Sequence, residues 1–247
     1  MTLLSINLNK FALLRNARGE DRPNLIEICK KCIQFGAEGI TVHPRPDERH
    51  TKYSDLLDLK KIISHFNNIE YNIEGYPSDD FVNHIVDLSP DQITLVPDPP
   101  EALTSSFGWD CQVNKSFLQK IVKKIQSHNI RVSLFVNPSI NSLQYLNEIN
   151  PDRVELYTYD YAKNFKNDKF KSIEPYKEVG DYINSNFPNI LLNAGHDLNL
   201  DNLKFILDEI PNIQEVSIGH ALVCDSLIYG LENTVKKYSS IVKLKKI

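Results

Sequence analysis

The chain has 247 residues, of which 41% are hydrophobic and 24% are charged, and its formal net charge is −4. This composition is typical of a globular protein. It excludes a disordered chain and argues against a nucleic-acid partner attracted by bulk charge. No segment approaches the roughly 18 apolar residues of a membrane span, and the short apolar N-terminus lacks the basic region of a signal peptide. We therefore expect a cytoplasmic protein with neither a membrane nor a nucleic-acid partner.

Short apolar or alternating segments, rich in β-branched residues, alternate along the chain with amphipathic segments. The expected strands are Leu3–Leu8, Gly39–His43, Glu70–Glu74, Gln92–Val96, Ile130–Val136, Arg153–Tyr157, Ile190–Ala194 and Val216–Ile218. The expected helices are Asn24–Phe35, Ser54–Phe66, Ser78–Leu88, Lys115–Ser127, Ser139–Glu148, Pro175–Asn186, Asp201–Asp208 and about Leu222–Leu244. Ser54, Ser78 and Asp201 are the expected helix N-caps.

This alternation indicates parallel strands joined by crossover helices. Eight strands and about eight helices in a chain of this length predict an α/β fold, a (β/α)8 TIM barrel. We expect one catalytic domain over residues 1–247, with some extra short helices. A doubly wound open sheet is the alternative. No glycine-rich dinucleotide or P-loop sequence follows the first strand, so nothing favours a nucleotide site of those kinds.

Cys29 and Cys32 form a Cys-x-x-Cys pair, which raises the question of metal or redox chemistry. The pair shares one face of an expected helix with Leu25, Ile28 and Ile33. No second pair of cysteines or nearby pair of histidines completes a set of four ligands. We therefore interpret these cysteines as core residues.

Polar residues gather at the carboxyl ends of the expected strands, where barrel enzymes carry their active sites. They are Asn7 and Asn9, His43, Glu74, Asn137, Glu155 and Tyr157, Asn193 and His196, and Gly219 and His220. Alternation along the strands turns Glu74 and Glu155 into the barrel. Two carboxyl groups in one enclosed site do not ionise independently, and such groups suit acid–base chemistry near neutral pH. The alternative is structural pairing, for instance with Arg15 or Arg18.

Two segments indicate phosphate binding. The loop after His43 carries Arg45, Arg49 and His50, which favour an anion, although Asp47 and Glu48 could make it merely a charged surface loop. The pairs Gly195-His196 and Gly219-His220 follow the last two strands. Barrels often bind phosphate there, because glycines let backbone N–H groups approach an oxyanion.

These residues resemble the pyridoxine 5′-phosphate synthase family. The resemblance runs from about residue 3 to 232 and rests on the following segments: Asn7 with Leu14-Arg15-Asn16-Ala17-Arg18-Gly19, Gly39-Ile40-Thr41-Val42-His43, Arg45 to His50, Ile73-Glu74, Leu95-Val96-Pro97, Val132-Ser133-Leu134-Phe135, Asn193-Ala194-Gly195-His196 and Ile218-Gly219-His220-Ala221. The resemblance implies condensation of 3-amino-2-oxopropyl phosphate with 1-deoxy-D-xylulose 5-phosphate to pyridoxine 5′-phosphate, phosphate and water. It also implies a homo-octamer that needs no metal and no organic cofactor.

The resemblance further implies a role for each site residue. His43 and Glu74 would be proton acceptors, His196 a proton donor, and Glu155 a stabiliser of charge in transition states. The remaining substrate-binding residues fall into two groups: Asn7, Arg18, Gly219 and His220 for the amino ketone phosphate, and Arg45, His50 and Thr104 for the deoxyxylulose phosphate.

Three features depart from the family pattern. Asn9-Lys10 stands where the family has Asp-His, and Asp197 stands where it has glycine. The loop at Thr104 has one glycine fewer. We keep Asn9, Lys10 and Asp197 as substrate-binding candidates, and we expect Lys10 to bind rather than to transfer protons.

Two other functions fit the same barrel. One is a different phosphate-handling enzyme, an aldolase or an isomerase. A Schiff-base aldolase would need an inward lysine at a strand end, and only Lys10 comes near that position. The other is a barrel that binds a metabolite without turning it over.

Overall fold

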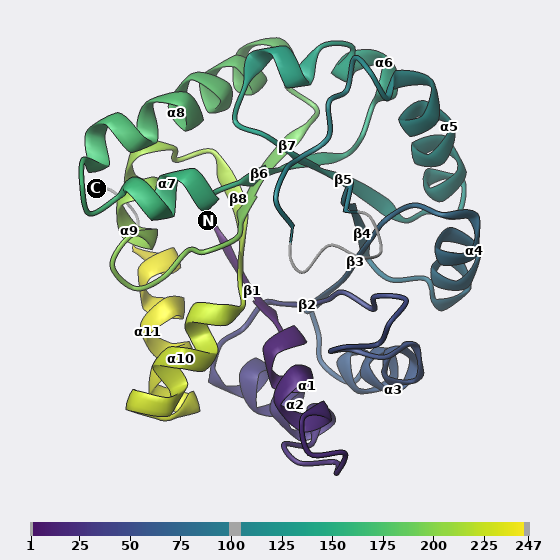
Figure 1. Ribbon diagram of the computed structural model, residues 1–247, viewed down its shortest axis with the longest axis vertical. Coiled ribbons are helices and arrows are strands. Elements are labelled where there is room, and N and C mark those ends of the chain that lie inside the picture. Colours follow the sequence, from purple (N-terminus) through teal and green to yellow (C-terminus); the bar gives the residue numbers. More distant parts are fainter. Residues whose placement is uncertain (1, 99–104, 245–247) are drawn as a thin grey trace.

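Figure 1 shows a computed structural model that describes residues 2–98 and 105–244. Its strands form one closed barrel in the order β1-β2-β3-β4-β5-β6-β7-β8, and every neighbouring pair is parallel. The strands are β1 (Leu3–Asn7), β2 (Gly39–Val42), β3 (Glu70–Gly75), β4 (Gln92–Leu95), β5 (Arg131–Val136), β6 (Arg153–Tyr157), β7 (Leu191–Gly195) and β8 (Ile213–Ile218). The predicted (β/α)8 barrel is confirmed, and the open sheet is excluded.

Helices surround the barrel on its outside (Figure 1). They are α1 (Asn9–Asn16), α2 (Leu25–Phe35), α3 (Tyr53–Ile63), α4 (Asp79–Leu88), α5 (Lys115–Gln126), the 3₁₀ helix η1 (Ile140–Leu143), α6 (Leu146–Ile149), α7 (Tyr159–Asn164), α8 (Lys169–Asn186), α9 (Leu203–Glu209), α10 (His220–Tyr229) and α11 (Leu231–Lys243). Ser78 caps α4 as predicted, since its hydroxyl accepts a hydrogen bond from the Phe81 N–H. The other two predicted caps are wrong: Lys52 and Asn202 precede α3 and α9.

Several predicted helices differ in extent. The segment Leu222–Leu244 is two helices because Gly230, at φ 76°, interrupts it between α10 and α11. Helix α8 starts at Lys169, so Pro175 lies inside it rather than at its start. Ser139–Glu148 is divided into η1 and α6. Helices α1 and α7 occupy segments for which the sequence pattern predicts no helix.

Apolar and polar residues alternate along each strand because the inner and outer faces of the barrel differ. The residues that face the helices are apolar and fully buried, as with Leu4 and Ile6 in β1 or Val154 and Leu156 in β6. The residues between them are largely polar, such as Ser5 in β1. Parallel strands are usually continuous apolar runs because both of their faces are apolar. Here the polar interior produces the period of two.

The outer core also contains Cys29 and Cys32, both fully buried. Burial raises the pKa of the Cys29 thiol to about 12, so this thiol stays protonated and unreactive at neutral pH. Burial also raises the pKa of the Cys32 thiol. Within the described part of the chain, no group of three His, Cys, Asp or Glu residues could hold a metal ion. Because both side chains are fully buried in the hydrophobic core, the interpretation of this pair as core residues is confirmed.

A charge network closes the amino end of the barrel interior. Arg153 Nη1 lies 2.6 Å from Glu215 Oε2 and 3.0 Å from Glu70 Oε1. Arg131 Nη2 reaches Glu70 Oε2 at 2.6 Å from a half-exposed position. Arg153 and Glu215 are almost completely buried. The Arg153 guanidinium therefore lies against two carboxyl groups in a region with little water.

Glu215 leads to a prediction of how the stability of the protein depends on pH. Burial first, and then the charge of Glu70, raise its pKa to about 8 against the pull of Arg153. Because the pKa of Glu215 is higher in the folded state than in the unfolded state, the folded state holds this proton more tightly. The resulting contribution to stability is complete below about pH 4.5 and is lost as pH rises through about 8. We expect the urea midpoint to fall between about pH 5 and pH 9.

Urea titrations across that range measure this effect. Glu215→Gln should fall less steeply, because one of the titrating groups is gone, whereas Asp58→Asn on the surface should follow the wild type. A wild-type midpoint that rises over the same pH range would contradict the prediction.

Candidate active site

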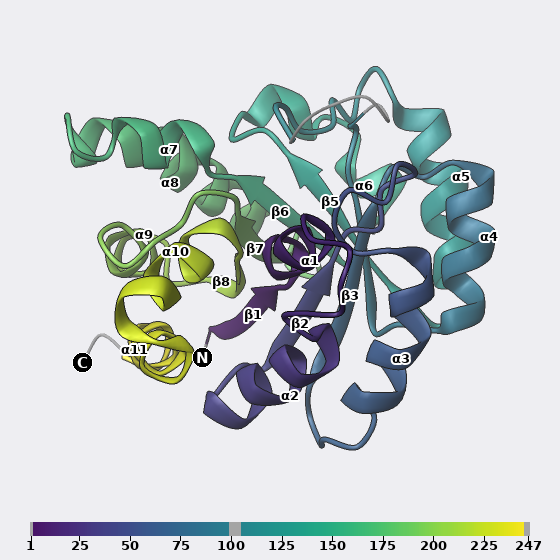
Figure 2. The same cartoon turned by 60° about the horizontal axis from the view of Figure 1, so that its bottom comes forward.

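The site lies at the carboxyl ends of the strands, with α1 just beyond the end of β1 (Figure 2). Glu74 near the end of β3 is its centre. Its Oε2 accepts a hydrogen bond from Asn7 Nδ2 at 3.3 Å and lies 3.8 Å from His43 Nδ1. Asn7 ends β1 and His43 directly follows β2. Parallel strands thus bring together residues that are far apart in the sequence, as predicted.

Burial and neighbouring charges set the protonation of this centre. Burial and Asp98 raise the pKa of Glu74 to about 8, and Arg45 opposes them. Burial and the Glu74 charge hold the pKa of Glu155 well above its usual range, while Arg153 pulls it down. Burial and Arg45 keep the pKa of His43 well below its usual value. Near neutral pH the His43 imidazole is therefore neutral and Glu155 is protonated, whereas Glu74 populates both its protonated and its ionised form.

Asn9 fixes the loop that follows β2. Its Oδ1 accepts hydrogen bonds from the His43 N–H at 2.9 Å and from the Thr51 hydroxyl at 3.0 Å. The rings of His43 and His50 lie edge to face, with 5.9 Å between their centroids. The amide oxygen of Asn9 is thus engaged with the protein, and its expected contact with substrate stays a prediction.

Arg45 lies in a buried ion pair. Its Nη2 is 2.6 Å from Asp98 Oδ2, and the Ser105 hydroxyl donates to the same oxygen at 2.6 Å. His50 lies nearby, and burial, with the Arg45 charge next, lowers its pKa to about 4. Thr104 lies outside the described residues. The sequence analysis missed Asp98, although a polar residue after β4 follows the rule that identified the others.

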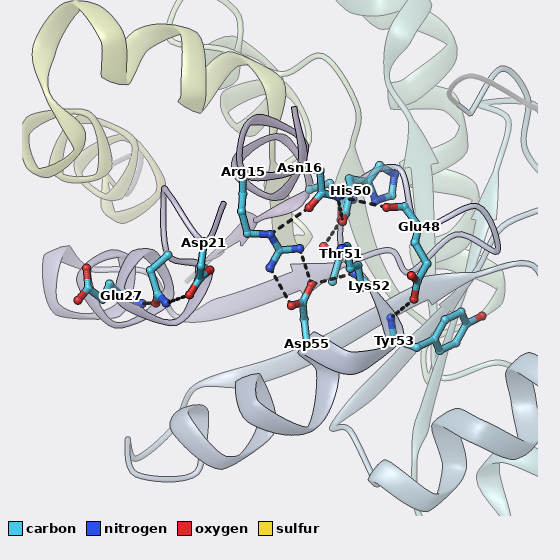
Figure 3. A network of polar contacts seen from close by, with 12 residues as sticks. Arg15, Asn16, Asp21, Glu27, Glu48, His50, Thr51, Lys52, Tyr53 and Asp55 are labelled. Carbon is cyan, nitrogen blue, oxygen red and sulfur yellow. Dashed lines mark hydrogen bonds and ion pairs between the residues drawn. The ribbon is translucent and has the colours of Figure 1, made fainter. Parts of the chain in front are cut away.

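Arg15, at the rim of the barrel, has a structural partner (Figure 3). Arg15 forms a two-pronged ion pair with Asp55, at 2.7 and 2.8 Å, and not with Glu74. Asn16 Nδ2 donates to the carbonyl oxygens of the loop at residues 48–50. Arg49 pairs with Asp47 at 2.5 Å, which supports the surface-loop alternative at this position. Arg18 is exposed beyond the end of α1.

The loop after β7 carries His196 and Asp197. His196 Nδ1 lies 2.5 Å from Asp197 Oδ2, and the Tyr157 ring lies 4.8 Å from the imidazole, nearly perpendicular to it. Gly195 has no room for a side chain, because a Cβ would overlap Glu155 Oε1. Glycine at this position lets β7 pack closely against the Glu155 carboxyl group.

The last strand leads into a helix N-terminus. Gly219 precedes α10, and His220 is the first residue of this helix. The Gly219 backbone passes close to Asn7, since a Cβ there would lie 3.3 Å from Asn7 Cβ. A helix N-terminus offers N–H groups and the positive end of the helix dipole, which suits a phosphate.

A closed barrel with two carboxyl groups and imidazoles enclosed at its mouth, next to the N-terminus of a helix, has the features of an acid–base barrel enzyme. Residues 4–244 match the family described as pyridoxal phosphate biosynthesis protein PdxJ, and the chain belongs to this family. It is similar to pyridoxine 5′-phosphate synthases of Cytophaga hutchinsonii, with 48% identity, and Parabacteroides distasonis, with 45%. These alignments cover 96% and 97% of this chain and 98% of each relative.

A solved structure shows the same fold at low identity. It is a 3-keto-L-gulonate-6-phosphate decarboxylase from Vibrio cholerae, with a TM-score of 0.65, 8% identity and 99% of both chains covered. At this identity the likeness extends to the barrel alone. No helix in residues 2–98 and 105–244 is long and apolar enough to cross a membrane.

Proposed function

We propose that this chain is a pyridoxine 5′-phosphate synthase. It condenses 3-amino-2-oxopropyl phosphate with 1-deoxy-D-xylulose 5-phosphate and releases pyridoxine 5′-phosphate, phosphate and water. The observation that carries the proposal is the match to synthases along nearly the whole chain. The grouping of His43, Glu74 and Glu155 at the barrel mouth supports it.

Each catalytic group has a role that suits its surroundings. A Schiff base forms, water and phosphate leave, and a ring closes, so protons move at several atoms. Neutral His43 and the ionised fraction of Glu74 accept protons. Protonated Glu155 donates a hydrogen bond to negative charge that develops in the transition states. His196 donates a proton to a leaving group.

The phosphates hold the two reactants in reacting geometry. Gly219 and His220 at the start of α10 bind the phosphate of the amino ketone, with Asn7 beside them. Arg45 and His50 face the deoxyxylulose phosphate from the loop after β2. We further propose Thr104, Arg18, Asn9, Lys10 and Asp197 as substrate contacts, as the family resemblance implies.

The same resemblance implies a cytoplasmic homo-octamer without metal or organic cofactor, and we propose this state. Helix α10 supports self-association, because Leu227 and Ile228 are 78% and 75% exposed. Neighbouring exposed apolar side chains are commonly buried by a partner. Light scattering of the purified protein tests the octamer.

An assay of the purified enzyme with each substrate alone and with both together tests the function. Pyridoxine 5′-phosphate fluorescence should appear only with both, accompanied by one phosphate per product. An aldolase or isomerase would convert one substrate alone, and a non-catalytic barrel would bind a substrate without product. Either result would reject the synthase.

Lys10 gives a prediction about binding. It is exposed in the first turn of α1, and its charge acts on both His50 and Asp197. An ammonium at this position can hold a substrate phosphate or hydroxyl. Lys10→Met should therefore raise KM and leave the pH profile of kcat in place, whereas Lys10→His should recover much of the affinity.

Steady-state kinetics across pH check this expectation, with Lys61→Met on the outer surface as the matched control. Loss of a lysine-like group from the kcat profile of Lys10→Met would mean that Lys10 transfers protons, contrary to the expected binding role.

A further inference from the structure

We propose that Asp197 is a positioning residue for His196: its carboxylate holds the Nδ1 proton, so that Nε2 is the atom that exchanges a proton with the substrate. This inference deepens the proposed function, because it rests on His196 as the proton donor. In addition to its proposed contact with substrate, Asp197 has its Oδ2 atom 2.5 Å from His196 Nδ1.

The backbone of the loop is built to make this contact. His196 and Asp197 have φ values of 85° and 60°, in the left-handed region that non-glycine residues rarely adopt. Strain of this kind persists only where the surroundings impose it. The buried Thr158 hydroxyl donates to the carbonyl oxygens of Gly195 and His196, and Asn202 Nδ2 donates to the Asp197 carbonyl at 3.3 Å.

The remaining surroundings of the ring restrict its rotation. Tyr157 and Tyr159 stack on each other and meet the imidazole at steep angles of 82° and 80°. The hydrogen bond to His196, aided by the charges of His220 and Lys10, keeps the pKa of Asp197 below its usual value. Asp197 is therefore a carboxylate at neutral pH.

The pair determines which nitrogen does the chemistry. A neutral imidazole has one N–H donor and one acceptor, and the partner of one nitrogen decides the tautomer. When the His196 imidazolium gives its Nε2 proton to the oxygen of a leaving group, the bond between carbon and that oxygen breaks, and the oxygen keeps the electron pair. The ring then keeps its Nδ1 proton on the hydrogen bond to Asp197, ready to be protonated again at Nε2.

The variant Asp197→Asn tests this positioning role most directly. Asparagine tolerates the left-handed backbone, so the loop should keep its shape. Its NH2 group donates to Nδ1 and favours the opposite tautomer. We expect kcat to fall by about 10–100-fold, with a smaller change in either KM. Asp201→Asn, an exposed carboxylate four residues further on, should leave both unchanged.

Two further readouts separate this inference from the proposed role of His196. Nitrogen NMR, assigned with His196→Gln, should show the proton of the neutral ring on Nδ1 in wild type and on Nε2 in Asp197→Asn. Adding Asp197→Asn to His196→Gln should cost nothing more. An Nε2 proton in wild type, or a kcat of Asp197→Asn within about threefold of wild type, would overturn the positioning role. A fully active His196→Gln would instead reject His196 as the donor, while the NMR result would still decide the tautomer.

Discussion

Replacing Glu74 by glutamine is expected to lower kcat by about 10²–10⁴-fold and to leave the fold intact. The amide keeps the size of the side chain and an acceptor for Asn7 Nδ2, but it cannot take a proton. Because the pKa of Glu74 is about 8, both of its protonation states are populated near neutral pH, and the substitution removes this property. Single-turnover kinetics with both substrates measure the loss.

Glu178→Gln is the matched control for this prediction. Glu178 is an exposed carboxylate on α8, outside the barrel, and its replacement should leave kcat unchanged. Circular dichroism and the urea midpoint should show that Glu74→Gln is folded. Activity of folded Glu74→Gln within about threefold of wild type would remove Glu74 from the mechanism.

Arg153→Met is expected to destabilise the protein by about 3–5 kcal/mol. Methionine fills a similar volume, but it leaves Glu70 and Glu215 in the barrel interior without the cation that lies 2.6–3.0 Å from them. Urea denaturation at neutral pH measures the change. Because the pKa of Glu215 is about 8, its ionised fraction grows as pH rises, so the loss should be larger at pH 9 than at pH 6.

Arg131→Met provides the comparison within the same network. Arg131 also contacts Glu70 at 2.6 Å, but its side chain is 40% exposed. Water screens such a pair, and we expect its loss to cost no more than about 1 kcal/mol. Equal costs for the two variants would show that burial of the pair does not determine its contribution to stability.

The barrel was predictable because its signals repeat along the chain. Each strand segment carries a period of two, and each following helix carries an apolar face, so errors in single elements do not change the fold. The errors were local. Gly230 divides a helix through one positive φ, and Pro175 lies in α8 where the pattern placed a helix start. Such features depend on a single residue and leave the periodicity unchanged.

The centre of the site was predictable for a similar reason. Parallel strands end at one rim, so Asn7, His43 and Glu74 had to meet. Pairings between side chains in loops follow no such rule. The ion pair of Arg45 with Asp98, and the contact of His196 with Asp197, depend on loop paths that periodicity does not encode.

A crystal structure of the enzyme with pyridoxine 5′-phosphate and inorganic phosphate bound tests the central claim most directly. The claim predicts the pyridine ring at the mouth of the barrel, within hydrogen-bond distance of Glu74, Glu155 and His196. It also predicts inorganic phosphate at the Gly219 and His220 N–H groups of α10. A product ring that binds away from these carboxyl groups, or a phosphate held elsewhere, would contradict the account.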